Sequence, residues 1–228
     1  MKPIIPFASP RTVGRPVVVA ALIAVAACAG QGGEGAASES DGDVARTTES
    51  AASDSAAAGP PPPPCWTRAD PAELAERASP LDSASVHLEA GVVKVCHGSP
   101  QMRGREIMGG LVPWNEAWRT GANEATSIHM PAAGTIAGVS VEPGRYSLYS
   151  IPGPETWEIV VNGQPERWGI PISQEVRAAD VGSGSVPMGS TDAPVEGLTL
   201  TLSREGPRAA TLAIEWETTR VEVPIRLE

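Results

Sequence analysis

The stretch "SVHLEAGVVKVCHG" (Ser85–Gly98) decides the class of fold, because its apolar and polar side chains alternate. Val86 and Leu88 alternate in the first arm, and valines recur with the same spacing in the second arm, after Ala90–Gly91. A period of two is the pattern of a strand with one buried face. Two such arms around a turn that contains glycine predict a β-hairpin.

The alternation continues to the C-terminal end of the chain. Further strands are predicted in "ATSIHMP", "GTIAGVSVEPG", "RYSLYSIPG", "TWEIVVNG", "GLTLTLSREG", "AATLAIEWE" and "TRVEVPIRL". Nine or ten short strands with one clear helix predict an all-β domain, either an antiparallel β-sandwich or a jelly-roll-like barrel. "GSGS" (Gly182–Ser185) is interpreted as a turn, because it is too short for a phosphate-binding loop and contains no lysine. We expect no cofactor.

One short helix is predicted before the strands. Asp70 is a suitable N-cap, Pro71 suits the first helical position, and Glu73 lies three residues after the cap. Pro80 ends the helical pattern.

The N-terminal residues 1–27 have the pattern of an export signal. A basic start precedes the apolar run "PVVVAALIAVAA" (Pro16–Ala27), which is too short to span a bilayer. "VAAC" (Val25–Cys28) resembles a bacterial lipobox, which implies a multiply acylated, membrane-anchored Cys28. The alternative is an ordinary secretory peptide. We expect a cell-envelope location, on the periplasmic or cell-surface side, with the outer membrane preferred.

Residues 28–64 are predicted to form a tether, and residues 65–228 the folded domain. The tether is rich in Gly, Ala, Ser and acids, a composition typical of disorder, and it ends in the spacer Pro60–Pro64. The domain carries 13 basic against 21 acidic side chains, and its acidity makes a nucleic-acid partner unfavourable. Cys65 and Cys96 form an even pair outside the lipobox, so an oxidising compartment favours a disulfide between them.

Two stretches do not fit strands and are the best places to look for function. They are residues 98–124 and residues 162–175. The first carries aromatic rings beside hydrogen-bonding groups, a combination suited to a sugar or a carboxylate; the candidate binding residues are Trp114, Trp118, Arg119, Asn123 and Glu124. The alternative is structural: Arg119 and Glu124 pair with each other or with backbone, and the indole rings fill the core. Trp157 and Trp216 lie in strand patterns and are expected in the core, whereas Trp168 lies near a loop.

The motifs "GREIMGGLVPWNEAWRTGANEAT", "PGRYSLYSIPG", "WEIVVNG", "RWG" and "LAIEWETTRVEVPI" resemble the DUF2911 family of bacterial domains of unknown function. The resemblance covers about residues 80–226. It implies an exported, mostly β domain and brings no activity with it.

Catalysis has weaker support than binding. Glu124 and His129 form an acid–base pair only if both reach one cleft, which would make the protein a hydrolase. The three histidines lack the spacing of a metal site, so no metal is expected. A third possibility is a structural envelope protein that acts through protein contacts.

Overall fold

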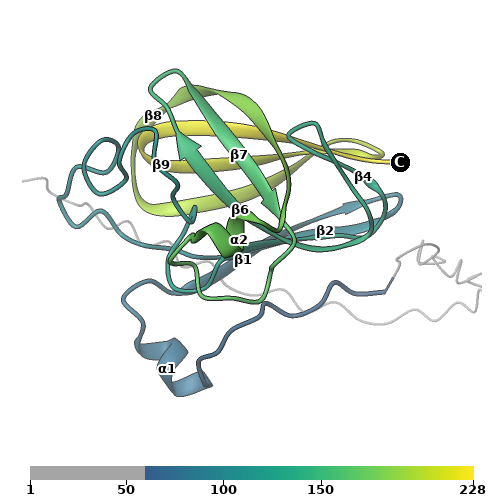
Figure 1. Cartoon of the computed structure of the whole chain (residues 1–228), viewed down its shortest axis with the longest axis horizontal. Coiled ribbons are helices and arrows are strands. Elements are labelled where there is room, and N and C mark those ends of the chain that lie inside the picture. The colour runs from purple at the N-terminus through teal and green to yellow at the C-terminus, as the bar shows by residue number, and fades with distance from the viewer. Residues whose placement is uncertain (1–59) are drawn as a thin grey trace, which may run out of the picture. The chain divides into compact units, whose positions relative to one another are not determined.

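The structure is a computed structural model that describes residues 60–228 (Figure 1). The predicted signal peptide, the predicted lipidation site Cys28 and the predicted tether up to residue 59 lie outside the described residues. Within the described part, no helix is long and apolar enough to cross a membrane.

Residues 60–228 form nine strands that join into one antiparallel sheet. The strands are β1 (Leu81–Leu88), β2 (Gly91–Gly98), β3 (Thr126–Met130), β4 (Gly134–Ile136), β5 (Val139–Val141), β6 (Gly144–Pro152), β7 (Thr156–Asn162), β8 (Asp180–Gly206) and β9 (Ala209–Leu227). Their order in the sheet is β1-β2-β3-β6-β7-β8-β9-β4-β5. The predicted hairpin is present as β1 and β2, with Val86 opposite Val93.

The all-β, antiparallel prediction is confirmed, but the hydrogen bonding is that of one curled sheet rather than a clear sandwich. The long strand β8 pairs with β7 through its first part and with β9 through the rest. Irregularities in register between Ser190 and Thr199 let the strand bend, as β-bulges do. β8 then returns against β1, as the curled ribbons in Figure 1 show. One continuous core fills the interior, with Trp157 and Trp216 fully buried as predicted.

The interpretation of "GSGS" as a turn is wrong, because Gly182–Ser185 lies inside β8 and pairs with β7. Glycine is needed at these positions because the strand packs closely against the segment around Ala137. A Cβ atom on Gly184 would come 1.8 Å from the carbonyl oxygen of Ala137, and one on Gly182 would touch Val139. The strand therefore passes a neighbouring turn at a distance that only glycine permits.

The predicted helix is α1 (Pro71–Glu76), and Asp70 and Glu73 form its capping box. A second, four-residue helix, α2 (Gln174–Arg177), was not predicted and begins at the N-cap Ser173. The structure also contains the predicted disulfide, with the Cα atoms of Cys65 and Cys96 5.7 Å apart.

The buried His97 makes stability depend on pH. Burial lowers the pKa of His97, although a hydrogen bond with the carbonyl of Leu198 partly opposes this. The folded state therefore prefers a neutral ring, and the unfolded chain takes up a proton first as pH falls below about 6.5. Stability from this group is complete above pH 6.5 and is lost below it, by at most about 1.4 kcal/mol per pH unit.

We expect His97→Gln to flatten the fall in unfolding free energy between pH 6.5 and pH 5, measured by urea denaturation. The matched control is His87→Gln, because His87 is exposed on the neighbouring strand. Equal slopes for wild type and His97→Gln would contradict a neutral buried imidazole.

Candidate functional site

The long connection between β2 and β3 is fixed to the sheet along its whole length. Trp118 exchanges two backbone hydrogen bonds with Ser150 of β6, at 2.8 and 2.9 Å. Glu124 forms an isolated bridge with Trp168, so the second irregular stretch holds the end of the first. The two irregular stretches therefore form one structure.

The backbone of this connection is strained at four non-glycine residues with positive φ, namely Arg103, Asn115, Thr120 and Asn123. Thr120 is β-branched, a type that rarely adopts φ of +53°. It is buried, and its hydroxyl lies 2.8 Å from the hydroxyl of Ser150. Strain of this kind persists only where surrounding contacts hold it, and it is often found at functional sites.

Trp118 lies in an indole cluster and not on an open platform. Its ring stacks on Trp216 at a centroid distance of 5.9 Å and meets Trp157 edge-on at the same distance. Trp114 packs against the core from the other end of "WNEAW", which forms turns and no helix. Trp114 and Trp118 therefore do not share a face of a helix. One face of Trp118 is covered, and its remaining surface is half-buried.

Glu124 and Asn123 bind other parts of the same chain. Both carboxylate oxygens of Glu124 accept hydrogen bonds from Arg77, at 2.6 and 2.9 Å, and one also accepts from Thr67. Burial alone raises the pKa of Glu124, but these hydrogen bonds outweigh burial, and its pKa is lower than usual. Asn123 donates to the carbonyl of Ser79 at 3.1 Å. Arg119 and Glu124 do not pair with each other in the described structure.

Of the predicted binding residues, Arg119 is the one whose side chain can still bind a ligand. Its Nε donates to the carbonyl of Gly121 at 3.0 Å, and no ion pair to it occurs within residues 60–228. Burial partly desolvates the charge of Arg119 and thereby lowers its pKa. A Cβ on Gly169 would come 2.6 Å from Cδ of Arg119, so "RWG" leaves room for this side chain to pass.

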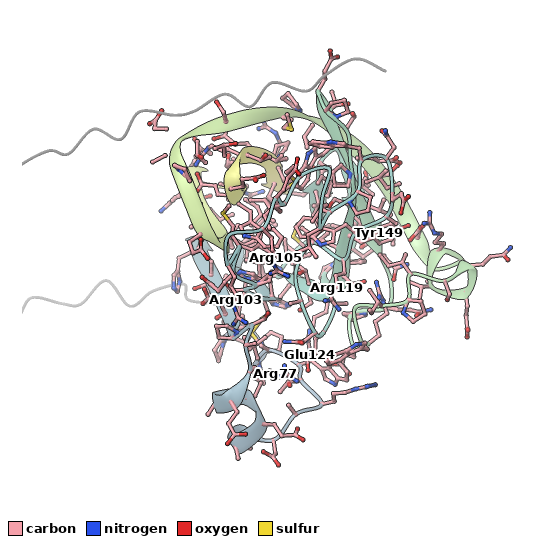
Figure 2. All side chains as sticks on the ribbon, turned by 90° about the vertical axis from the view of Figure 1, so that its left-hand side faces the viewer. Arg77, Arg103, Arg105, Arg119, Glu124 and Tyr149 are labelled. Atoms are coloured by element: carbon pink, nitrogen blue, oxygen red, sulfur yellow. A yellow bond between two sulfur atoms is a disulfide. The ribbon has the colours of Figure 1, made fainter. Side chains whose placement is uncertain are left out.

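Arg119 lines a pocket of about 330 Å³, which lies between the two irregular stretches. The lining residues are Ser79, Pro100, Arg105, Leu111, Ala117, Trp118, Arg119, Gly121, Ala122, Ile170 and Trp216. They include two arginines and no acid, in a domain with an excess of acids. Figure 2 shows Arg105 and Arg119 above Glu124 and Arg77.

Two exposed apolar side chains line this pocket. Leu111 is 47% exposed and Ile170 is 52% exposed. They are two of the three exposed large apolar side chains in the part of the chain that the structure describes. Sequence reasoning identified Trp118 and Arg119 but missed Arg105, Leu111 and Ile170. The sequence did contain one signal for Ile170, because an apolar residue stands there in an irregular stretch rich in Gly and Pro.

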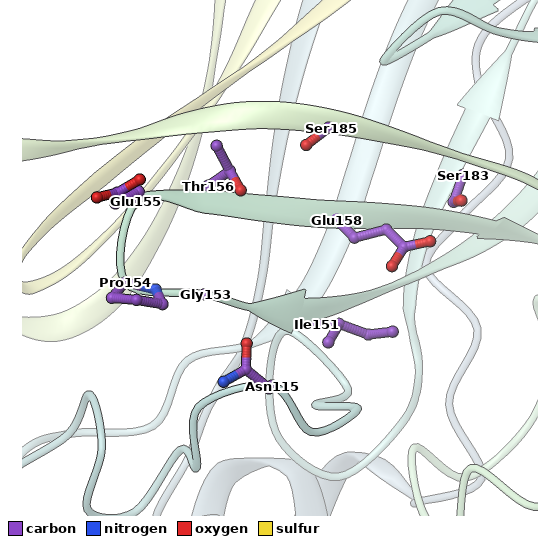
Figure 3. A pocket seen from close by; sticks show the side chains of 9 residues that line it. All are labelled: Asn115, Ile151, Gly153, Pro154, Glu155, Thr156, Glu158, Ser183 and Ser185. Atoms are coloured by element: carbon purple, nitrogen blue, oxygen red, sulfur yellow. The ribbon is translucent and has the colours of Figure 1, made fainter.

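A larger and more open pocket of about 540 Å³ lies beside the β6–β7 turn (Figure 3). It is lined by Glu155 and Glu158 together with strand hydroxyls such as Ser183 and Ser185. Of the predicted binding residues, none lines it.

The structure does not bring Glu124 and His129 together. Four residues of largely extended chain lie between them, and five steps along such a chain correspond to roughly 16 Å between Cα atoms. His129 lies between Lys94 and Arg145 on the neighbouring strands, while Glu124 is occupied by Arg77. Within residues 60–228 no group of three His, Cys, Asp or Glu side chains could hold a metal ion.

The fold and the site thus define an all-β domain with a small arginine-lined pocket on its irregular connections. Residues 79–225 match the model of the family described as "Protein of unknown function (DUF2911)". The match covers well over half of the chain, and the chain belongs to this family. The predicted extent, about residues 80–226, agrees with it. No curated protein and no solved structure matches the chain.

Proposed function

We propose that this protein is a lipid-anchored binding protein of the bacterial cell envelope, and that its domain binds a small anion with an apolar body. The observation that carries the binding proposal is that Arg105 and Arg119 both line a pocket with exposed apolar side chains and, among the described residues, no acid. Arg105 adds positive charge, while its Nε and Nη2 donate to the carbonyls of Met102 and Gln101. The anchor and the location rest on the lipobox-like Cys28 in the sequence.

The chemistry of the pocket favours a carboxylate as the charged group. Arg119 is held at Nε by the carbonyl of Gly121, which leaves its two terminal nitrogens for a ligand. A guanidinium fork matches a carboxylate geometrically, and such charge-assisted hydrogen bonds are the strong ones. A partly desolvated arginine without an acid gains most from an incoming anion, because the local dielectric is low.

The walls of the pocket favour an apolar body on that ligand. Trp118, Leu111 and Ile170 offer apolar surface, and a volume of about 330 Å³ is at the small end for ligand pockets. A flat aromatic acid would place its ring against the indole and its carboxylate at Arg119. A sugar is less well served, because Ser79 is the only lining side chain with a hydroxyl or amide group to bond its hydroxyls.

We expect phenylacetate to raise the melting temperature of the full chain, and to bind more tightly than its neutral isostere phenylacetamide or the cationic phenethylamine. Arg119→Gln should weaken phenylacetate binding at least about tenfold, because a hydrogen bond to a charged group contributes roughly 1.5–3 kcal/mol. Calorimetric titration measures both effects.

The matched control is Arg204→Gln, since Arg204 also donates Nε to a carbonyl two residues ahead but lies exposed on β8. Equal binding of phenylacetate and phenylacetamide would overturn the anion proposal. Binding of a neutral sugar that survives Arg119→Gln would favour a carbohydrate ligand instead.

A further inference from the structure

The segment Cys65–Ser79 covers a part of the domain next to the anion pocket, whose lining it reaches only with Ser79. It is held at its start by the disulfide to Cys96 in β2. At its end it continues through Pro80, whose carbonyl accepts from Ser99, into β1. Between these two fixed ends the segment lies on Glu124 and Trp168.

The contact with Glu124 has the geometry of guanidinium recognition. Nη1 and Nη2 of Arg77 donate to different oxygens of the carboxylate, so the pair is bidentate. Thr67 Oγ1 and the backbone N–H of Arg68 complete the shell around Oε1, at 2.9 and 3.4 Å. Glu124 is only 3% exposed, so this carboxylate faces the segment and not solvent.

Trp168 supplies the aromatic half of the same site. The guanidinium carbon of Arg77 lies 5.9 Å from its ring centroid, and that of Arg68 lies 5.2 Å from it. A planar cation over an indole ring is attracted by the π electrons of the ring. A buried carboxylate beside an indole is therefore a receptor for a flat cation, and a lysine ammonium would match it less well.

The two halves of this contact come from different parts of the chain. Glu124 and Trp168 lie inside the family match of residues 79–225, whereas Thr67, Arg68 and Arg77 precede it. The two residues that contact Arg77 therefore lie in the family domain, and most of the segment that contacts them is N-terminal to that domain. An open pocket of about 520 Å³ continues outward from Arg77 and Trp168, and its other lining residues are Arg68, Ala69, Glu73 and Glu76.

We propose that Glu124 and Trp168 form a binding site for the guanidinium group of an arginine side chain, which the chain's own Arg77 occupies when the segment is docked. An arginine on a partner polypeptide is the ligand class that would replace it. The open pocket next to the site leaves room for the chain that carries this arginine. This proposal does not depend on the anion pocket, whose charge is opposite.

Chemical rescue of Arg77→Ala in the full chain tests the site, with N-acetyl-argininamide as the probe and N-acetyl-lysinamide as its matched control. We expect the arginine probe to raise the melting temperature of Arg77→Ala by about 3–6 °C at ten times its dissociation constant. The lysine probe should give little shift, because it lacks the bidentate fork. Wild type should not respond, since its site is filled.

The proposal predicts that Arg77→Ala/Glu124→Gln loses the rescue. If Arg77→Ala is already unfolded at 25 °C, the probe should restore its near-ultraviolet circular dichroism, because a ligand that binds only the folded state shifts the equilibrium toward it. Absence of rescue, equal rescue by the lysine probe, or rescue that persists without the Glu124 carboxylate would each overturn the proposal.

Discussion

Trp118→Ala is expected to lower the free energy of unfolding by about 3–4 kcal/mol, within the range for removal of a large aromatic side chain from a packed site. Trp118 is the middle ring of three, stacked on Trp216 and edge-on to Trp157, and both neighbours are fully buried. Removing it uncovers two indoles that are fully buried in wild type and enlarges the pocket that Trp118 lines. Urea denaturation followed by far-ultraviolet circular dichroism measures the loss.

The control for Trp118 is Trp66→Ala, because Trp66 is half-buried and lies outside the core cluster. We expect Trp118→Phe to recover part of the stability, since a smaller ring keeps part of the stack. A loss below about 1 kcal/mol for Trp118→Ala would mean that the indole cluster does not support the fold.

Arg77→Ala is expected to cost about 3 kcal/mol at pH 7, because it leaves the carboxylate of Glu124 buried without a counter-charge. In wild type the pKa of Glu124 is lowered, so the stability from the pair is present above about pH 4.5 and is lost as pH falls through the folded pKa. In the variant, burial without Arg77 raises that pKa, so Glu124 takes up a proton readily. The difference between the two proteins should therefore shrink from pH 7 to pH 4, which denaturation at both pH values measures.

Arg68→Ala separates the ion pair from the cation–π contact. Arg68 reaches Glu124 only through its backbone N–H, and its side chain lies over Trp168. We expect a loss under about 1 kcal/mol, typical of an exposed cation–π contact. Equal losses for Arg68→Ala and Arg77→Ala, or a difference between Arg77→Ala and wild type that does not change with pH, would contradict a buried and paired Glu124.

Local patterns predicted the elements whose causes are local. The capping box of α1 needs only Asp70, Pro71 and Glu73, and the β1–β2 hairpin needs only its alternation and turn. Trp157 and Trp216 follow from strand periodicity. The disulfide follows from cysteine parity and compartment, since the sequence offers Cys65 a single other partner outside the lipobox.

Features set by distant partners could not be predicted from local patterns. "GSGS" has the composition of a turn, and only its packing against Ala137 and Val139 explains its place in β8. The sheet curls because β8 is long and bends, which its separate apolar runs do not reveal. Glu124 has the same residue type as a ligand-binding or catalytic acid; its role is decided by Arg77, 47 residues away.

The pocket illustrates the same limit. Arg119 was identified because it lies in a polar-aromatic loop, whereas Ile170 joins it only because Gly169 and Asn123 hold the second stretch against the first through a 2.8 Å backbone hydrogen bond. Whether the pocket attracts an anion or a cation depends on which charged side chains are already paired. Among residues 60–228, Glu124 is in an ion pair and Arg119 is not, a distinction that composition does not contain.

Fluorine NMR of the full chain labelled with 5-fluorotryptophan tests the anion pocket most directly, because all six tryptophans lie in the described domain and serve as position markers. Single Trp→Phe variants assign the six resonances. On titration with phenylacetate, we predict that the resonances of Trp118 and Trp216 shift with one common dissociation constant, while those of Trp66 and Trp168 stay in place. No shift at Trp118, or a shift at Trp168 alone, would contradict an anion-binding pocket at Arg119.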